Sequence, residues 1–149
     1  MLKKFKMEDC KPVTTPMIMG CKLCFGDGSV DIDQRLYRSM IGSLLYLTAS
    51  RPDIMLAVGL VARYQVTPKQ NHLLAVKRIL RYLQGTAQYG LWYPKGKSFT
   101  LTAYTDADWA SCVDDRKSTS GGAFYLGESL VAWLSKKQTS ISLFTTEAE

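Results

Sequence analysis

The sequence is short of the residues that build disulfide scaffolds and membrane spans. Four cysteines are spread over 149 residues, too few for a disulfide framework, which indicates a reducing compartment. No apolar stretch reaches the ~20 residues that a membrane-spanning helix needs, so no membrane partner is expected. Residues 1–9 contain lysines but neither an apolar core nor a small-residue cleavage site. We therefore predict no secretory signal and a cytoplasmic or nuclear location.

Histidine is also scarce, which bears on metal binding. Cys21 and Cys24 have the spacing of half a zinc site, but no second pair follows them, and the single histidine, His72, lies far away in the sequence. Because a tetrahedral zinc site needs four ligands, two incidental thiols in a loop are favoured over structural zinc.

The net charge of +6 is unevenly distributed along the chain. Residues 51–97 contain eight basic residues and one acidic residue, a balance of +7, whereas residues 98–149 contain four basic and seven acidic residues, a balance of −3. This pattern is typical of a protein that contacts phosphates with one part and collects cations with the other. Ordinary solvated surface explains the charge equally well.

Apolar side chains recurring at steps of three and four predict a first helix from about residue 33: Leu36, Met40, Leu44 and Leu47. It should end before Pro52, because proline disfavours a helical residue before it. A second apolar helix is predicted over residues 53–64.

A third helix has both a start signal and a stop signal. Thr67 is the expected cap, Pro68 occupies the first turn and Gln70 completes a capping box. Gly85 is expected to end the helix in a left-handed conformation. Off the apolar stripe of this helix lies an exposed basic flank, which consists of Lys77, Arg78 and Arg81. Such a flank is either solvated surface or a nucleic-acid contact.

After residue 85 the apolar period changes to two, which predicts strands over residues 89–93, 99–105, 123–126 and 130–134. Residues 141–144 lead into what resembles the first turn of a helix. The fold class is therefore α+β, with a helical N-terminal half followed by an antiparallel β-meander.

Two carboxylates stand where metal chemistry could occur. Asp106 ends a predicted strand and Glu149 lies in the predicted helical turn. Carboxylates from neighbouring elements can bind divalent ions that activate water for phosphodiester cleavage, and Mg²⁺ suits such ligands. From spacing alone the signal is weak, since acids near strand ends are common.

Longer sequence segments are more specific than these spacings. They are KKFKMEDCKPV (3–13), YRSMIGSLLYL (37–47), RPDI (51–54), AVKRILRYL (75–83), DADWA (106–110), RKSTSG (116–121), WLSKKQ (133–138) and TEAE (146–149). Together they closely resemble successive signatures of copia-type retrotransposon polyproteins, in family order and over essentially the whole chain. The resemblance implies that residues 1–32 correspond to the end of the reverse transcriptase palm, residues 33–98 to the thumb and connection, and residues 99–149 to an incomplete RNase H-like domain.

The resemblance also implies roles for individual residues. Asp106 and Glu149 match metal ligands of the family, which uses Mg²⁺, and Asp108 is the expected bystander. The helix flank of Lys77, Arg78 and Arg81 would face the backbone of an RNA–DNA hybrid or DNA, contacting phosphates rather than bases.

Catalysis is not expected from these 149 residues. The family's polymerase aspartates belong to a part of the palm before Met1, and its further RNase H carboxylates follow Glu149. Because losing one member of a metal constellation removes most of the rate, Asp106 and Glu149 are expected to be vestigial, without a functional Mg²⁺. What remains is weak, sequence-independent nucleic-acid binding.

An alternative comes from a different class of protein. The run Arg78-Ile79-Leu80-Arg81 matches the Arg-x-Leu-Arg pattern of secreted oomycete effectors, which would imply secretion, entry into a plant cell and host plant proteins as partners. Against it, the pattern has three fixed letters and lies inside a predicted helix, and neither a signal peptide nor an acidic companion motif accompanies it.

Overall fold

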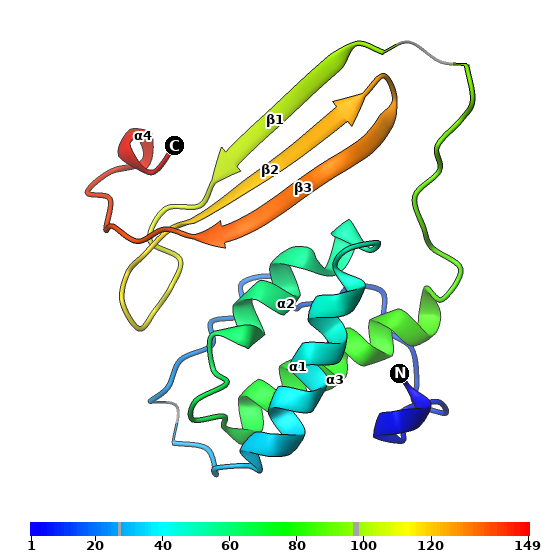
Figure 1. Ribbon diagram of the computed structural model, residues 1–149. Coiled ribbons are helices and arrows are strands. Elements are labelled where there is room, and N and C mark those ends of the chain that lie inside the picture. Colours follow the sequence, from blue (N-terminus) through cyan, green and yellow to red (C-terminus); the bar gives the residue numbers. More distant parts are fainter. Residues whose placement is uncertain (27, 97–98) are drawn as a thin grey trace. The chain divides into compact units, whose positions relative to one another are not determined.

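The structure, a computed structural model, describes residues 1–26, 28–96 and 99–149 and divides the chain into two units. Met1–Tyr89 forms a helical unit and Gly90–Glu149 forms a sheet unit (Figure 1). The predicted α+β class is confirmed. No helix within the described parts is long and apolar enough to cross a membrane.

Three helices build the helical unit, after a short 3₁₀ turn at Lys3–Phe5. They are α1 (Gln34–Leu47), α2 (Met55–Ala62), which follows a 3₁₀ turn at Pro52–Ile54, and α3 (Gln70–Gly85). All three were predicted from the apolar period, and Figure 1 shows them packed against one another. The first helix is capped by Asp33, whose carboxylate accepts a hydrogen bond from the Arg35 backbone N–H at 2.8 Å.

The core of this unit consists of apolar side chains from all three helices and the Pro52–Ile54 turn. Its fully buried members are Tyr37, Ile41, Leu44, Ile54, Val58, Val61, Val76, Ile79 and Leu80. Each large aliphatic side chain among them contributes about 1.5–3 kcal/mol by leaving water. This burial holds α3 rigidly, so the residues on its outer face have fixed positions.

The start of α3 differs from its prediction. Its cap is Lys69 rather than Thr67, because the Lys69 backbone N–H donates to Nδ1 of His72 at 3.0 Å. Nε2 of His72 lies 3.0 Å from the carbonyl oxygen of Cys24, and since Nδ1 accepts, Nε2 must carry the proton. Both ring nitrogens therefore bond to backbone, and His72 is fully buried.

The end of α3 also differs. Gly85 is the last helical residue, and its φ is not among the positive values of the described glycines. A Cβ at this position would lie 2.9 Å from Cβ of Pro12, closer than two carbon atoms can approach. The glycine is thus explained by the close passage of the N-terminal segment and not by a left-handed cap.

The sheet unit is a three-stranded antiparallel meander of order β1-β2-β3. Its strands are β1 (Leu101–Ala107), β2 (Thr119–Leu126) and β3 (Ser129–Lys137), and a single helical turn, α4, follows at Thr145–Ala148. Strands β2 and β3 extend further than predicted, because each continues as long as its partner supplies hydrogen bonds.

One of the predicted strands is not a strand. Residues 89–93 are irregular, since an alternating pattern forms a strand only where a neighbouring strand pairs with it. The hydroxyl of Tyr93 instead donates to the Leu130 carbonyl at 2.9 Å. The first predicted residues of the strand over 99–105 are likewise irregular, and the link before it includes residues 97–98, which lie outside the described parts.

Candidate functional site

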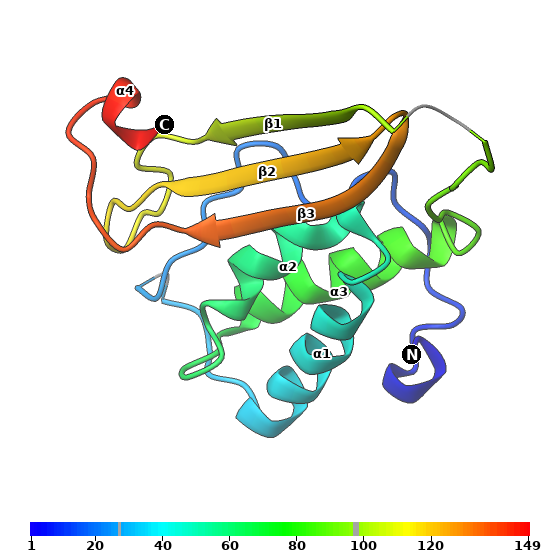
Figure 2. The same cartoon turned by 45° about the horizontal axis from the view of Figure 1, so that its top comes forward.

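The two carboxylates predicted to bind metal lie at the same end of the sheet. Asp106 is the penultimate residue of β1 and pairs with Gly121 of β2. Figures 1 and 2 both show α4, which immediately precedes Glu149, beside the carboxyl end of β1. Both Asp106 and Glu149 are exposed, so solvent and ions can reach them.

Gln138, which the sequence analysis did not single out, fastens α4 to this end of the sheet. Its side-chain amide Nε2 donates to Oγ of Ser120 at 2.9 Å and to the carbonyl oxygen of Ala148. Its backbone N–H donates to the carbonyl of Ser118 at 2.9 Å. Because Ser120 pairs with Ala107 of β1, one side chain connects the Asp106 end of the sheet with the turn that precedes Glu149.

The neighbouring acid, Asp108, has local hydrogen bonds that explain its presence. Its Oδ1 accepts from the backbone N–H of Thr119 at 2.8 Å, and its Oδ2 accepts from the hydroxyl of Ser111 at 2.7 Å. These bonds join the end of β1 to the start of β2. They give Asp108 a structural role, and its expected status as a bystander to metal binding stays a prediction.

The donor set at this end of the sheet fits only part of a metal site. Oxygen ligands such as Asp106 and Glu149 suit Mg²⁺, but a two-metal nuclease site needs more carboxylates than two. Within residues 1–26, 28–96 and 99–149, no group of three or more His, Cys, Asp or Glu side chains is placed to hold a metal ion. The predicted metal role of Asp106 and Glu149 stays a prediction.

The predicted basic flank of α3 is only partly exposed. Lys77 is exposed, whereas Arg78 and Arg81 are half-buried. Nη2 of Arg78 donates to Oγ1 of Thr15 at 2.9 Å, and Nε of Arg81 donates to the Lys11 carbonyl at 2.7 Å. The N-terminal segment therefore lies along this face of the helix. The expectation of a fully exposed flank is right for Lys77 and wrong for the two arginines.

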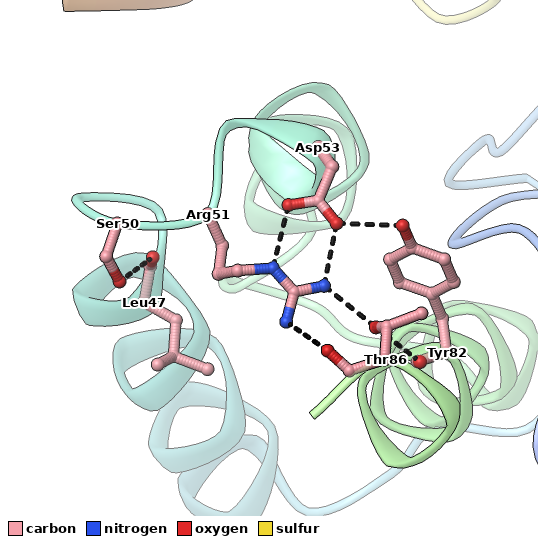
Figure 3. A network of polar contacts seen from close by, with 6 residues as sticks. All are labelled: Leu47, Ser50, Arg51, Asp53, Tyr82 and Thr86. Carbon is pink, nitrogen blue, oxygen red and sulfur yellow. Dashed lines mark hydrogen bonds and ion pairs between the residues drawn. The ribbon is translucent and has the colours of Figure 1, made fainter. Parts of the chain in front are cut away.

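A further cation of the basic segment, Arg51, forms its ion pair and hydrogen bonds with groups of the protein itself (Figure 3). Its Nε and Nη2 donate to the two carboxylate oxygens of Asp53 at 2.9 and 2.7 Å. Nη1 and Nη2 also donate to the carbonyl and hydroxyl of Thr86, just beyond α3, at 3.0 and 2.8 Å. With Arg51 7% exposed, its charge serves the fold and not a ligand.

The carboxylate of Asp53 is completed by a third donor. The hydroxyl of Tyr82 donates to its Oδ2 at 2.8 Å. Burial by itself raises the pKa of Asp53, but the hydrogen bonds from Arg51 and Tyr82 outweigh it and leave the pKa below its usual value. The network joins the link between α1 and α2 to the C-terminal end of α3, and sequence reasoning missed it because its members are up to 35 residues apart.

The Arg-x-Leu-Arg run is part of the folded core. Ile79 and Leu80 are fully buried in α3, and Arg78 and Arg81 contact the N-terminal segment. A receptor that reads four consecutive residues cannot reach the middle two without unfolding the helix. The structure therefore disfavours these residues as a linear recognition motif.

Comparison with known proteins decides the family. The chain is 45% identical over all 149 residues to the retrovirus-related Pol polyprotein from transposon RE1 and 43% identical to that from transposon RE2, both of Arabidopsis thaliana. The chain belongs to the copia-type retrotransposon Pol family. It spans about a tenth (10%) of the length of either polyprotein.

A shorter relative has a different name. The secreted RxLR effector protein 161 of Plasmopara viticola is 44% identical over 114 residues, which are 76% of this chain and 80% of that protein. No profile of a known protein family matches the chain, and no solved structure matches it either. The RNase H-like assignment of the copia-type sheet unit accordingly stays a prediction.

Proposed function

We propose that this copia-type Pol segment contacts the phosphate backbone of an RNA–DNA hybrid or of DNA through its helical unit, weakly and without sequence preference, and that its 149 residues alone catalyse neither polymerisation nor hydrolysis. The observation that carries the first part is the basic outer face of α3, where Lys77 is exposed and two arginines keep unused donors. Guanidinium groups suit phosphate oxygens geometrically.

The second part of the proposal rests on the incomplete donor set at the sheet end. Asp106 and Glu149 provide two carboxylates, and the described residues offer no third metal ligand beside them. A bound Mg²⁺ would supply water activation and charge neutralisation in a complete site. Asp106 on β1 and Glu149 after α4 are therefore not expected to catalyse hydrolysis by themselves.

Binding is tested by fluorescence anisotropy with a labelled RNA–DNA hybrid at several salt concentrations. Charge reversal at Lys77, Arg78 and Arg81 should weaken binding at least ~tenfold. It should also make the slope of log K against log salt concentration shallower, by up to ~0.9 for each lost phosphate contact. The matched control reverses Lys3, Lys4 and Lys6, which changes the net charge equally on another surface. Equal losses in both variants would show that net charge alone governs binding, and the proposal would fail.

Catalytic inactivity is tested with the same hybrid in the presence of Mg²⁺. We expect no cleavage above the level of an Asp106→Asn control. Cleavage by the wild-type chain that disappears in Asp106→Asn would overturn this part of the proposal, whatever the outcome of the binding experiment.

A second candidate function is favoured by the relationship to the secreted RxLR effector protein 161, most of which this chain spans. In this alternative the chain acts by binding proteins of a plant host cell. It predicts a change in cell death or defence when the chain is expressed in leaves. Since Ile79 and Leu80 are buried, the change should depend on a folded helical unit, and a core variant such as Leu80→Asp should abolish it.

A further inference from the structure

A cavity of about 410 Å³ lies in the helical unit, between residues 16–23 and residues 71–81 of α3. Its volume is within the usual range of small-molecule sites. The cationic lining side chains are Lys22, Arg78 and Arg81, and the largest apolar ones are Met17, Ile18, Leu23 and Leu74. No lining residue is acidic, so the three positive charges are not neutralised within the cavity.

The two guanidinium groups are already oriented. Arg78 donates from Nη2 to Thr15, and Arg81 donates from Nε to the Lys11 carbonyl. Because a guanidinium has five N–H donors, each group retains further donors after these bonds. Nε of Arg78 is buried and has no partner within the described parts of the chain. An anion that binds here would meet cations whose conformational entropy is already lost, which favours affinity.

The apolar lining is as informative as the charge. Leu74 is 52% exposed and Ile18 is 58% exposed, although both belong to a hollow beside a well-packed core. A ligand with an apolar, flat body would remove this surface from water at a gain of roughly 25 cal/mol per Å². Free inorganic phosphate would leave this apolar surface in contact with water, and an uncharged apolar ligand would leave the three cations without an anionic partner.

We propose that this cavity binds a single nucleotide unit, with its phosphate on Lys22, Arg78 and Arg81 and its base against Leu74 and Ile18. This inference rests on the proposed nucleic-acid function and deepens it. The cavity would be a site on the helical unit that recognises a phosphate together with its base, as found at the end of a nucleic-acid strand. Binding of a nucleotide in the cavity would add affinity to that of the salt-sensitive contacts with the phosphate backbone.

The test is a calorimetric titration of the full chain with adenosine 5′-monophosphate, with adenosine and inorganic phosphate as comparison ligands. We expect the nucleotide to bind at least ~tenfold more tightly than either, because only it engages both the cations and the apolar lining. Equal affinity for the nucleotide and for inorganic phosphate would overturn the proposal, and so would equal affinity for adenosine.

Variants locate the binding. Leu74→Asp should weaken nucleotide binding at least ~tenfold, because it replaces the apolar contact with the base by a charged carboxylate, whereas Leu56→Asp, at a leucine 53% exposed on α2 and outside the cavity, should not. Lys22→Gln should weaken binding, and Lys3→Gln, at an exposed lysine of the helical unit outside the cavity, should leave it unchanged. Equal effects of the paired variants would contradict the assignment.

Two further outcomes separate this inference from the function it rests on. If Leu74→Asp leaves nucleotide binding intact while charge reversal on α3 still weakens binding of the hybrid, the cavity assignment fails alone. If the nucleotide binds but the hybrid does not, the proposed function fails. Comparing 5′-phosphorylated with unphosphorylated oligonucleotides then distinguishes a strand end from a free nucleotide, and displacement of the nucleotide by an acidic peptide at lower concentration would indicate a protein partner instead.

Discussion

Arg51 illustrates how a single side chain can fix the relation between helices. Its guanidinium group contacts both oxygens of Asp53 and two oxygens of Thr86, and it lies 5.8 Å from the ring centre of Tyr82. A buried charge is tolerated only when it is paired and hydrogen-bonded. Here the planar fork of arginine meets both conditions with acceptors from two different elements.

We predict that Arg51→Lys lowers the free energy of unfolding of the helical unit by about 2 kcal/mol, because an ammonium group keeps the charge but cannot contact Asp53 and Thr86 in this geometry. Urea unfolding followed by far-ultraviolet circular dichroism measures the change. Arg35→Lys, at an exposed position of α1, is the control and should change stability by no more than about 0.5 kcal/mol. Equal stability of both variants would mean that the network contributes little.

In the sheet unit, Asp115 is a carboxyl group whose ion pair with Lys137 depends on pH. Burial raises the pKa of its carboxyl group, but hydrogen bonds from Lys137 and Cys112 and a backbone hydrogen bond outweigh burial and lower the pKa from 3.8 to about 2. Nζ of Lys137 lies 2.7 Å from Oδ2 of Asp115. A carboxyl group whose folded pKa is depressed stabilises the protein above its unfolded pKa, and this contribution is lost as the pH falls through the folded value.

The sheet unit should therefore lose stability between about pH 4 and pH 2, and Asp115→Asn should make this loss smaller. Tryptophan fluorescence during thermal unfolding is a suitable measurement, since Trp92, Trp109 and Trp133 all belong to this unit. Asp106→Asn removes a carboxylate from the same unit and serves as the control. An unchanged acid dependence in Asp115→Asn would show that other groups control it.

At the scale of elements, α3 depends on the N-terminal segment as much as on the other helices. The side chains of Arg78, Arg81 and Gln84 all donate hydrogen bonds to residues 8–15, and Pro12 passes against Gly85. The segment has no regular secondary structure of its own at these residues. Its position is therefore decided by contacts with the helix.

Paired glycine substitutions test this arrangement. Gly42→Ala in α1, where a Cβ meets no atom within 4 Å, should raise the free energy of unfolding by about 0.5–1 kcal/mol through better helix propensity. Gly85→Ala should instead lower it by about 1–2 kcal/mol, because the new Cβ overlaps Pro12. Chemical denaturation of both variants measures the difference.

The contact itself can be removed as a further control. In a Pro12→Gly background, Gly85→Ala should cost much less, since the Cβ and Cγ of residue 12 are gone. If Gly85→Ala lowers the free energy of unfolding equally in that background, the strain does not arise from contact with residue 12.

At the scale of the whole molecule, apolar burial is divided unequally between the two units. The core cluster of buried apolar residues consists entirely of residues 37–83 in the helical unit. The described residues of the sheet unit bury mainly small side chains, such as Ala110, Cys112 and Ser118, while Leu101 and Tyr104 of β1 are 70% and 64% exposed. The units should consequently differ in local stability.

Amide hydrogen exchange should reveal this difference. We expect amides in the middle of α1 and α3 to exchange at least ~tenfold more slowly than those of β1, because opening a helix exposes the core whereas opening β1 exposes little additional apolar surface. Mass spectrometry of peptides from the intact chain measures both units at once. Equal protection of β1 and α3 would mean that the sheet is stabilised by contacts beyond those within its own unit.

The sequence by itself determined the three helices, the antiparallel meander and the copia-type family. Helices were predictable because the apolar period of residues such as Leu44 and Leu80 reports which face is buried, whatever that face packs against. The family was predictable because long segments recur in order. Neither inference requires knowledge of contacts between distant residues.

Tertiary structure alone decided the rest. It made Gly85 a point of close approach, enclosed Arg51 between two elements, and left residues 89–93 without a strand partner. It also bonded two of the three predicted phosphate-binding cations to the N-terminal segment and used Gln138 to fasten the turn before Glu149. In each case the partner is distant in sequence, and strand pairing, helix capping and ion pairing depend on which distant groups come within a few ångströms of one another.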